Sequence, residues 1–258
     1  MPAQRRLILI TGASGAIGGA LARAYAQPEV ELILNGRNHQ ALAAVADKCE
    51  ALGAKVTLSP HDLNHNKILQ HWLEELSESK LPDLVILAAG INISSGEHGK
   101  GENTDASARL MNINLQVPIR IAQVLAPRMQ ARGSGQLVFI SSLAAWHGLP
   151  VTPSYCASKA GIKAYGEALR GALASSGVGV TVVMPGYVRS PMAAGMPGPK
   201  PWQWEPERAA RVIRHGIARN RARITFPFPL NLGSWWLGVL PAALSQRLVR
   251  WFGYGGPR

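Results

Sequence analysis

Residues 7–18 constrain the fold of this chain more than any other stretch. Leu7 to Ile10 is a continuous apolar run, which is typical of a strand buried on both faces of a parallel sheet. A glycine-rich turn, Thr11 to Gly18, follows it and opens a helix. Glycines let the backbone approach a ligand closely, and the free N–H groups of a first helical turn favour a pyrophosphate. The stretch predicts a dinucleotide-binding turn, although its glycine spacing also fits an ordinary strand-to-helix turn.

The segments that follow alternate between apolar runs and helical patterns. We expect strands at 7–10, 31–34, 55–59, 84–87 and 137–140, and helices at 19–27, 39–52, 64–77 and 106–132, the last interrupted at Pro118 and Pro127. This alternation predicts an α/β fold with a doubly wound, Rossmann-like parallel sheet and helices on both faces. At 258 residues the chain suits one domain, with a catalytic part at 1–226 and an apolar helical extension at 227–258.

Charge and cysteine content narrow the class of protein. Lys and Arg exceed Asp and Glu by 27 to 15, a net charge of +12 that attracts anionic partners of several kinds. The sequence has neither the aromatic strand of an RNA-binding module nor metal-ligand spacing of Cys and His, so we expect no nucleic acid and no metal. Two cysteines, Cys49 and Cys156, give no disulfide framework, and the first strand begins too close to Met1 for a signal peptide. A cytoplasmic enzyme is expected.

The end of the second strand indicates which dinucleotide binds. In this fold an acidic residue there binds the ribose 2′-hydroxyl of NAD, whereas an arginine suits the 2′-phosphate of NADP. Gly36 and Arg37 occupy this position, which favours NADP(H) over NAD unless Arg37 is only a solvated loop residue. Beyond the third strand, Asp62 either accepts a hydrogen bond from the adenine amine or caps the next helix.

Three residues further along form a candidate catalytic group. Ser142 follows the fifth strand, Tyr155 lies thirteen residues later, and Lys159 comes one helical turn after Tyr155. Residues at i and i+4 share one helix face, so the Lys159 ammonium is expected beside the phenol and should lower its pKa. Tyr155 would then act as general acid or base, and Ser142 would hydrogen-bond a substrate carbonyl. A Tyr-x-x-x-Lys pair alone also occurs as surface decoration of a helix.

The motifs taken together resemble the short-chain dehydrogenases/reductases. The resemblance runs from about residue 6 to residue 192 and depends on five segments in this order: Thr11–Gly18, Asp62, Asn114 within Met111–Leu115, Ser142 with Tyr155–Lys159, and Pro185–Ser190. It implies a catalytic triad of Ser142, Tyr155 and Lys159. It also implies that Asn114 holds a water linking Lys159 to solvent, and that hydride passes between nicotinamide and a carbonyl carbon while Tyr155 transfers the proton.

The resemblance also implies which residues contact the cofactor. Lys159 would bind the nicotinamide ribose, and Pro185 to Ser190 would hold the carboxamide. The full expected set is Gly12, Ser14, Gly15, Ala16, Ile17, Arg37, Asp62, Leu63, Ala89, Gly90, Tyr155, Lys159, Pro185, Gly186, Val188 and Ser190. Two departures stand out: Ala16 replaces the usual second glycine of the turn, and Leu87-Ala88-Ala89-Gly90 replaces Asn-Asn-Ala-Gly. The first affects the phosphate contacts and the second affects stability more than chemistry.

The segment after Ser190 is rich in Pro and Gly and follows the carboxyl end of a strand, where ligands bind in this fold. It is expected to be a substrate lid. Its apolar residues either line a pocket for a bulky hydrophobic carbonyl compound or only pack the lid onto the body. The side chains considered are Met192, Met196, Trp202 and Trp204, together with Trp146, His147 and Tyr187.

The extension at 227–258 lies outside the resemblance. No charged residue occurs from Ile224 to Gln246, and Trp235 and Trp236 lie in the middle of this stretch. Its prolines argue against one spanning helix. We expect amphipathic turns that pack on a second subunit of a homo-oligomer or lie on the inner face of the membrane, with Arg247, Arg250 and Arg258 toward anionic head groups.

These observations together predict an NADP(H)-dependent oxidoreductase that interconverts a carbonyl compound and an alcohol, with a hydrophobic small-molecule substrate. One alternative is a non-redox epimerase or dehydratase that uses the same triad and retains its cofactor. Another is a membrane-associated NADP-binding scaffold without catalysis; a broken triad would indicate it, and Ser142, Tyr155 and Lys159 are all present.

Overall fold

Seven parallel strands form one sheet in the order β3-β2-β1-β4-β5-β6-β7. The computed structural model describes residues 5–94 and 101–255. The strands are β1 (Arg6–Thr11), β2 (Val30–Asn35), β3 (Lys55–Ser59), β4 (Leu84–Leu87), β5 (Gly135–Ile140), β6 (Val178–Pro185) and β7 (Arg223–Phe226). The chain winds outward from β1 to β3, returns to β4 beside β1, and then winds outward in the other direction. The predicted doubly wound fold is confirmed.

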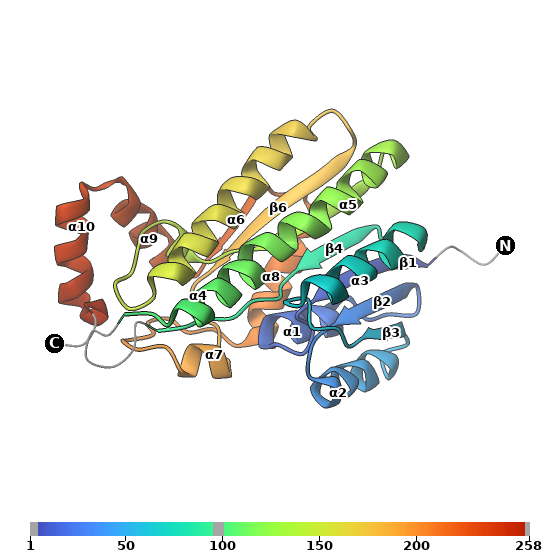
Figure 1. Cartoon of the computed structure of the whole chain (residues 1–258), viewed down its shortest axis with the longest axis horizontal. Helices are drawn as coiled ribbons and strands as arrows, with labels where there is room; N and C mark the ends of the chain where they lie inside the picture. Colours follow the sequence, from blue (N-terminus) through green and yellow to red (C-terminus); the bar gives the residue numbers. More distant parts are fainter. Residues whose placement is uncertain (1–4, 95–100, 256–258) are drawn as a thin grey trace.

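Helices cover both faces of this sheet (Figure 1). One face carries α1 (Ala16–Tyr25), α2 (His39–Glu50) and α8 (Pro206–Ala218); the other carries α3 (Asn66–Glu78), α5 (Val117–Arg132) and α6 (Pro153–Ala172). Ile8 and Ile10 pack toward the first layer and Leu9 toward the second. The strands are therefore apolar without alternation because both of their faces are buried.

The long helical pattern expected at 106–132 is one nearly continuous helical segment, so the predicted interruptions at Pro118 and Pro127 are wrong. It consists of α4 (Thr104–Met111), a π-helical turn (Asn112–Gln116) and α5. Pro118 lies in the first turn of α5, and Pro127 lies inside the helix. Pro118 therefore lies just after the π-helical turn, so the hydrogen bond that it cannot donate falls at the junction of the two elements. The loop predicted at 91–105 includes residues 95–100, which lie outside the described residues.

Two glycines set the geometry where β1 turns into α1. Gly12 has a φ of +68°, and a Cβ there would lie 2.7 Å from the backbone of Ala89; a Cβ on Gly18 would lie 2.3 Å from the Gly12 carbonyl oxygen. Only glycine fits either position. The helix begins at Ala16, three residues earlier than expected. The Ala89 N–H donates to Thr11 Oγ1 at 3.2 Å, so a hydroxyl ties β4 to β1 in this chain.

The C-terminal extension folds into α9 (Leu230–Val239), α10 (Ala242–Val249) and a π-helical turn (Arg250–Tyr254). These elements lie at the end of the molecule opposite the start of β1 (Figure 1). In the part of the chain that the structure describes, no helix is long and apolar enough to cross a bilayer.

Candidate active site

A cavity of about 1170 Å³ runs along the carboxyl ends of the central strands. The residues that follow β1, β2, β4, β5 and β6 all line it, which is the usual ligand position at the point where strand order reverses. Every residue expected to contact the cofactor lies on its wall: Gly12, Ser14, Gly15, Ala16, Ile17, Arg37, Asp62, Leu63, Ala89, Gly90, Tyr155, Lys159, Pro185, Gly186, Val188 and Ser190. Ser142 also lines the cavity.

The glycine-rich turn presents free donors to the cavity. Gly15 is the N-cap of α1. Because glycine has no side chain, it cannot accept a hydrogen bond from the N–H groups of the first helical turn. Ala16 and Ile17, in that first turn, line the cavity. The close approach of Gly12 to Ala89 keeps side chains out of the floor of this turn. A cradle of backbone donors at the positive end of a helix fits a pyrophosphate.

The end of β2 carries no carboxylate. Asn35 is buried there, and its amide donates to the carbonyl oxygens of Ser59 at 2.8 Å and His61 at 3.2 Å. Gly36 follows, and a Cβ on it would lie 2.7 Å from the Ser14 hydroxyl oxygen. The exposed Arg37 comes next. Ser14 and Arg37 therefore lie around this strand end as neutral and cationic hydrogen-bond donors.

Asp62 lines the cavity and does not cap the next helix, so that alternative is wrong. The helix α3 begins at Asn66, and its N-cap is His65. Asp62 Oδ1 instead accepts from the backbone N–H of Asn64 at 3.0 Å. A turn of this kind satisfies the carboxylate locally.

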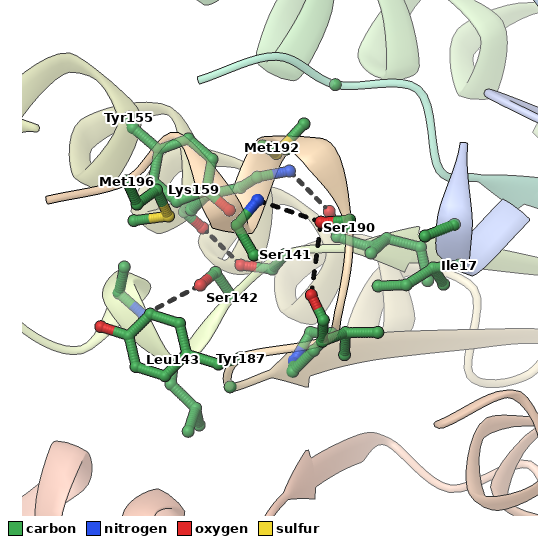
Figure 2. Close-up of a pocket in the computed structure, with 18 of the residues that line it drawn as sticks. Ile17, Ser141, Ser142, Leu143, Tyr155, Lys159, Tyr187, Ser190, Met192 and Met196 are labelled. Carbon is green, nitrogen blue, oxygen red and sulfur yellow. Dashed lines mark hydrogen bonds between the residues drawn. The ribbon is translucent and has the colours of Figure 1, made fainter. Parts of the chain in front are cut away.

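Tyr155, Ser142 and Lys159 meet at the inner end of the cavity (Figure 2). Tyr155 and Lys159 lie one turn apart on α6, and Lys159 Nζ is 5.6 Å from the centre of the Tyr155 ring. The Ser142 side chain lies close enough to the Tyr155 phenol to lower its pKa, although burial has the larger and opposite effect. Lys159 Nζ donates to the Ile140 carbonyl oxygen at 2.9 Å, which fixes the ammonium below the end of β5. The three expected residues are thus brought together.

The expected lowering of the Tyr155 pKa is not seen. Burial raises the pKa of Tyr155 to about 12, and the nearby Ser142 hydroxyl opposes this only in part. Burial likewise lowers the pKa of Lys159 to about 8. Desolvation disfavours the charged form of both groups, and here it outweighs the attraction between them. The protein by itself keeps Tyr155 a neutral phenol.

Asn114 is buried next to this group but does not line the cavity. Its Oδ1 accepts from the Ile91 N–H at 2.9 Å, and its Nδ2 donates to the Ile91 carbonyl and to Ser158 Oγ. A Cβ on Gly90 would lie 3.1 Å from Asn114 Oδ1 and 3.5 Å from Lys159 Nζ, so both atoms face the same small space. The amide connects the end of β4 to α6.

The substrate side of the cavity contains only part of the predicted aromatic and methionine set. Met192, Met196, Trp202, His147 and Tyr187 line it. Two of the predicted residues lie elsewhere, because each packs against a different group. Trp204 stacks on Phe226 at 4.8 Å, and the Trp146 ring lies between Lys163 and Arg223.

The C-terminal extension supplies wall residues that the sequence analysis missed. Side chains from α9, α10 and the turn after α10 line the cavity, namely Leu230, Leu232, Trp236, Leu237, Leu240, Leu248, Phe252 and Tyr254. Tyr254 also donates to the Pro199 carbonyl oxygen at 2.6 Å, which joins the extension to the predicted lid. The absence of charge in this stretch indicated burial or association, but nothing in the sequence indicated that these side chains line the chain's own cavity.

A dinucleotide cradle at the reversal of strand order, with a Tyr–Lys pair and a serine in the same cavity, defines the class of NAD(P)-dependent dehydrogenases and reductases. The model of the short chain dehydrogenase family matches residues 6–198. The protein belongs to the short-chain dehydrogenase/reductase family and is an oxidoreductase of that type. The match ends before α8 and the C-terminal extension.

Individual relatives agree with this assignment. An uncharacterized oxidoreductase of Myxococcus xanthus is 31% identical over 95% of this chain and 96% of its own length. The ketoacyl reductase HetN of Nostoc sp. is 29% identical over 96% of this chain and 89% of its own length. Among solved structures, a short-chain dehydrogenase from Sphingobium yanoikuyae in complex with NADPH has a TM-score of 0.81 at 25% identity and covers 95% of both chains.

Proposed function

We propose that the protein interconverts a hydrophobic carbonyl compound and its alcohol with NADP(H). The observation that supports this best is the position of Ser142, Tyr155 and Lys159 on the same cavity wall as the glycine-rich turn. Bound nicotinamide would supply the hydride to the carbonyl carbon, or accept it in the reverse direction. The side chains of this protein would handle the proton and the oxygen.

Tyr155 is the proposed proton donor in the direction of reduction. Burial keeps its phenol neutral at ordinary pH, which is the form that can give a proton to the developing alkoxide. The Ser142 hydroxyl lies near the phenol, and the two groups would hold the substrate oxygen between them. The Lys159 ammonium would bind the nicotinamide ribose and stabilise the phenolate that remains after proton transfer.

Asn114 is proposed as a positioning residue. Its amide fixes the backbone of Ile91 and the hydroxyl of Ser158, and its oxygen shares the space in front of Gly90 with Lys159 Nζ. A water in that space would link Lys159 to solvent and return the proton. The remaining proposed cofactor contacts are the cavity-wall residues named above.

The preference for NADP(H) rests on the end of β2. Arg37 and the Ser14 hydroxyl would both contact the 2′-phosphate, and no acidic side chain follows the strand to bind the ribose of NAD. The S. yanoikuyae enzyme, which resembles this chain in fold, binds NADPH.

The hydrophobic substrate is inferred from the cavity wall beyond Tyr155. Methionine, leucine and tryptophan side chains dominate that wall, and few polar groups would orient a small sugar-like substrate. One of the relatives is a ketoacyl reductase. The proposal includes a cytoplasmic homo-oligomer, and it fits a reducing compartment because Cys49 and Cys156 are buried and unpaired.

The test is a panel of ketones, aldehydes and alcohols assayed with both cofactors by nicotinamide absorbance. Tyr155→Phe should reduce kcat by about 10²- to 10⁴-fold, the usual contribution of a positioned general acid. Tyr165→Phe is the matched control, because Tyr165 lies on the same helix and packs against Phe139 outside the cavity. Equal activity of Tyr155→Phe and wild type would refute the assignment. An epimerase would instead bind the cofactor without steady net consumption.

A further inference from the structure

Large exposed apolar side chains are concentrated in the C-terminal extension. We call this set the apolar rim: Phe228, Leu232, Trp235, Trp236, Val239, Leu244, Trp251 and Phe252. Phe228 is 76% exposed and Trp251 is 78% exposed. Within α9, the rim residues recur at i, i+3, i+4 and i+7 from Leu232 to Val239, so they form one exposed stripe. A contiguous apolar surface of this kind marks an interaction site.

The apolar rim is continuous with the mouth of the active-site cavity. Leu232, Trp236 and Phe252 line the cavity, yet 48%, 53% and 53% of their surfaces remain exposed. One side of each of these residues therefore faces the cavity, and the other faces the surroundings of the protein. Whatever covers the rim also covers the entrance to the site.

The charges around the rim have one sign. Residues 227–255 contain Arg247 and Arg250, both exposed, and no acidic residue. Arg247 lies one turn after the rim residue Leu244 on the same face of α10, and the rim residue Trp251 follows in the π-helical turn. Arg258, which was also expected to face anionic head groups, lies outside the described residues. A surface that mixes Trp, Leu and Arg in this way suits the interface of an anionic bilayer.

We propose that the apolar rim docks on an anionic lipid bilayer and that the substrate, a lipid-like carbonyl compound, enters the cavity from the bilayer. This rests on the proposed function for the identity of the substrate, but docking itself does not. A second copy of the chain is the competing occupant. In a two-fold contact the same surface meets itself, and this surface would bring arginines together without a carboxylate of its own to pair with them.

Vesicle sedimentation tests the docking. With phosphatidylcholine vesicles containing phosphatidylglycerol, wild type should bind, and binding should weaken with vesicles of phosphatidylcholine alone and with added salt. Trp251→Gln and Trp235→Gln should each reduce the partition coefficient about tenfold or more. Arg247→Gln should reduce it about fivefold. Leu52→Gln, which changes an exposed leucine after α2, is the matched control and should have no effect.

Turnover separates failure of docking from failure of the proposed function. With a long-chain ketone in vesicles, Trp251→Gln should lose most of its NADPH oxidation, but it should keep wild-type activity on a short water-soluble carbonyl compound, because Trp251 does not line the cavity. Vesicle binding without turnover of any carbonyl compound would refute the function and leave docking intact. Docking would be refuted if wild type and Trp251→Gln partitioned equally onto vesicles. It would also be refuted if the wild type were a dimer and Trp251→Gln a monomer, because a second copy of the chain would then cover the apolar rim.

Discussion

Replacing Arg37 tests the cofactor preference most directly. Its guanidinium is exposed at the end of β2, on the wall of the cavity and next to Gly36 and the Ser14 hydroxyl. Under the proposed function, Arg37→Ala removes a cationic partner of the 2′-phosphate of NADPH. In Arg37→Asp the phosphate also meets a carboxylate, which in turn can accept from the ribose 2′-hydroxyl of NADH.

The magnitude follows from the exposure of the side chain. A hydrogen bond to a charged group contributes about 1.5–3 kcal/mol, and exposure to solvent places Arg37 near the lower end of this range. Arg37→Ala should therefore raise the Kd for NADPH about tenfold. A carboxylate at about 4 Å from the phosphate in water adds about 1 kcal/mol of repulsion per unit charge. Arg37→Asp should weaken NADPH binding about a hundredfold.

The assay is titration of each variant with NADPH and with NADH, followed by nicotinamide fluorescence, at low and high salt. Affinity for NADH should change by no more than about twofold in Arg37→Ala and should improve in Arg37→Asp. Arg219→Asp is the matched control, because Arg219 is exposed after α8 and does not line the cavity. Unchanged NADPH affinity in Arg37→Asp would show that Arg37 is only a solvated surface residue.

Two further predictions concern protonation and the glycine turn. Carbonyl reduction should decline as the pH rises through about 8, where the buried Lys159 ammonium loses its proton while Tyr155, with a pKa of about 12, keeps its own. A pH profile of kcat/KM that stays flat to about pH 10 would contradict this. Gly18→Ala should destabilise the fold by about 1–3 kcal/mol, since the new Cβ would lie 2.3 Å from the Gly12 carbonyl oxygen. Gly171 lies in α6, and a Cβ there would have no atom within 4 Å, so Gly171→Ala should stabilise the fold by up to about 1 kcal/mol. Urea denaturation measures the stability of both variants. A Gly18→Ala protein more stable than Gly171→Ala would contradict this reasoning.

Local sequence patterns predicted the fold well, because the spacing of apolar residues in each segment indicates which of its faces are buried. The unalternating run from Leu7 to Ile10 required two covered faces, and the structure buries Ile8 and Leu9 on opposite sides of the sheet. The i, i+4 spacing of Tyr155 and Lys159 likewise fixed their common helix face, whatever the rest of the fold. Segments of this kind need no long-range information.

The pKa of Tyr155 could not be obtained in the same way. Spacing placed a cation near the phenol, which suggested a lower pKa, but the depth of burial was invisible in the sequence. Burial comes from the packing of distant elements around α6, and the resulting desolvation raises the pKa to about 12. The positions of Trp146 and Trp204 could not be predicted for the same reason. As large aromatic residues both suited a substrate pocket, but Trp146 packs against Lys163 and Trp204 stacks on Phe226, outside the cavity.

The sequence by itself determined the order of strands and helices along the chain, the glycine-rich turn and the residues of the candidate catalytic group, because periodicity, glycine and helical spacing act within a few residues. Only the tertiary structure decided that α9 and α10 close over the chain's own cavity. An apolar stretch predicts that its side chains will be buried, but the hydrophobic effect does not specify which surface buries them. The identity of the surface that covers such a stretch therefore depends on where the whole chain places it.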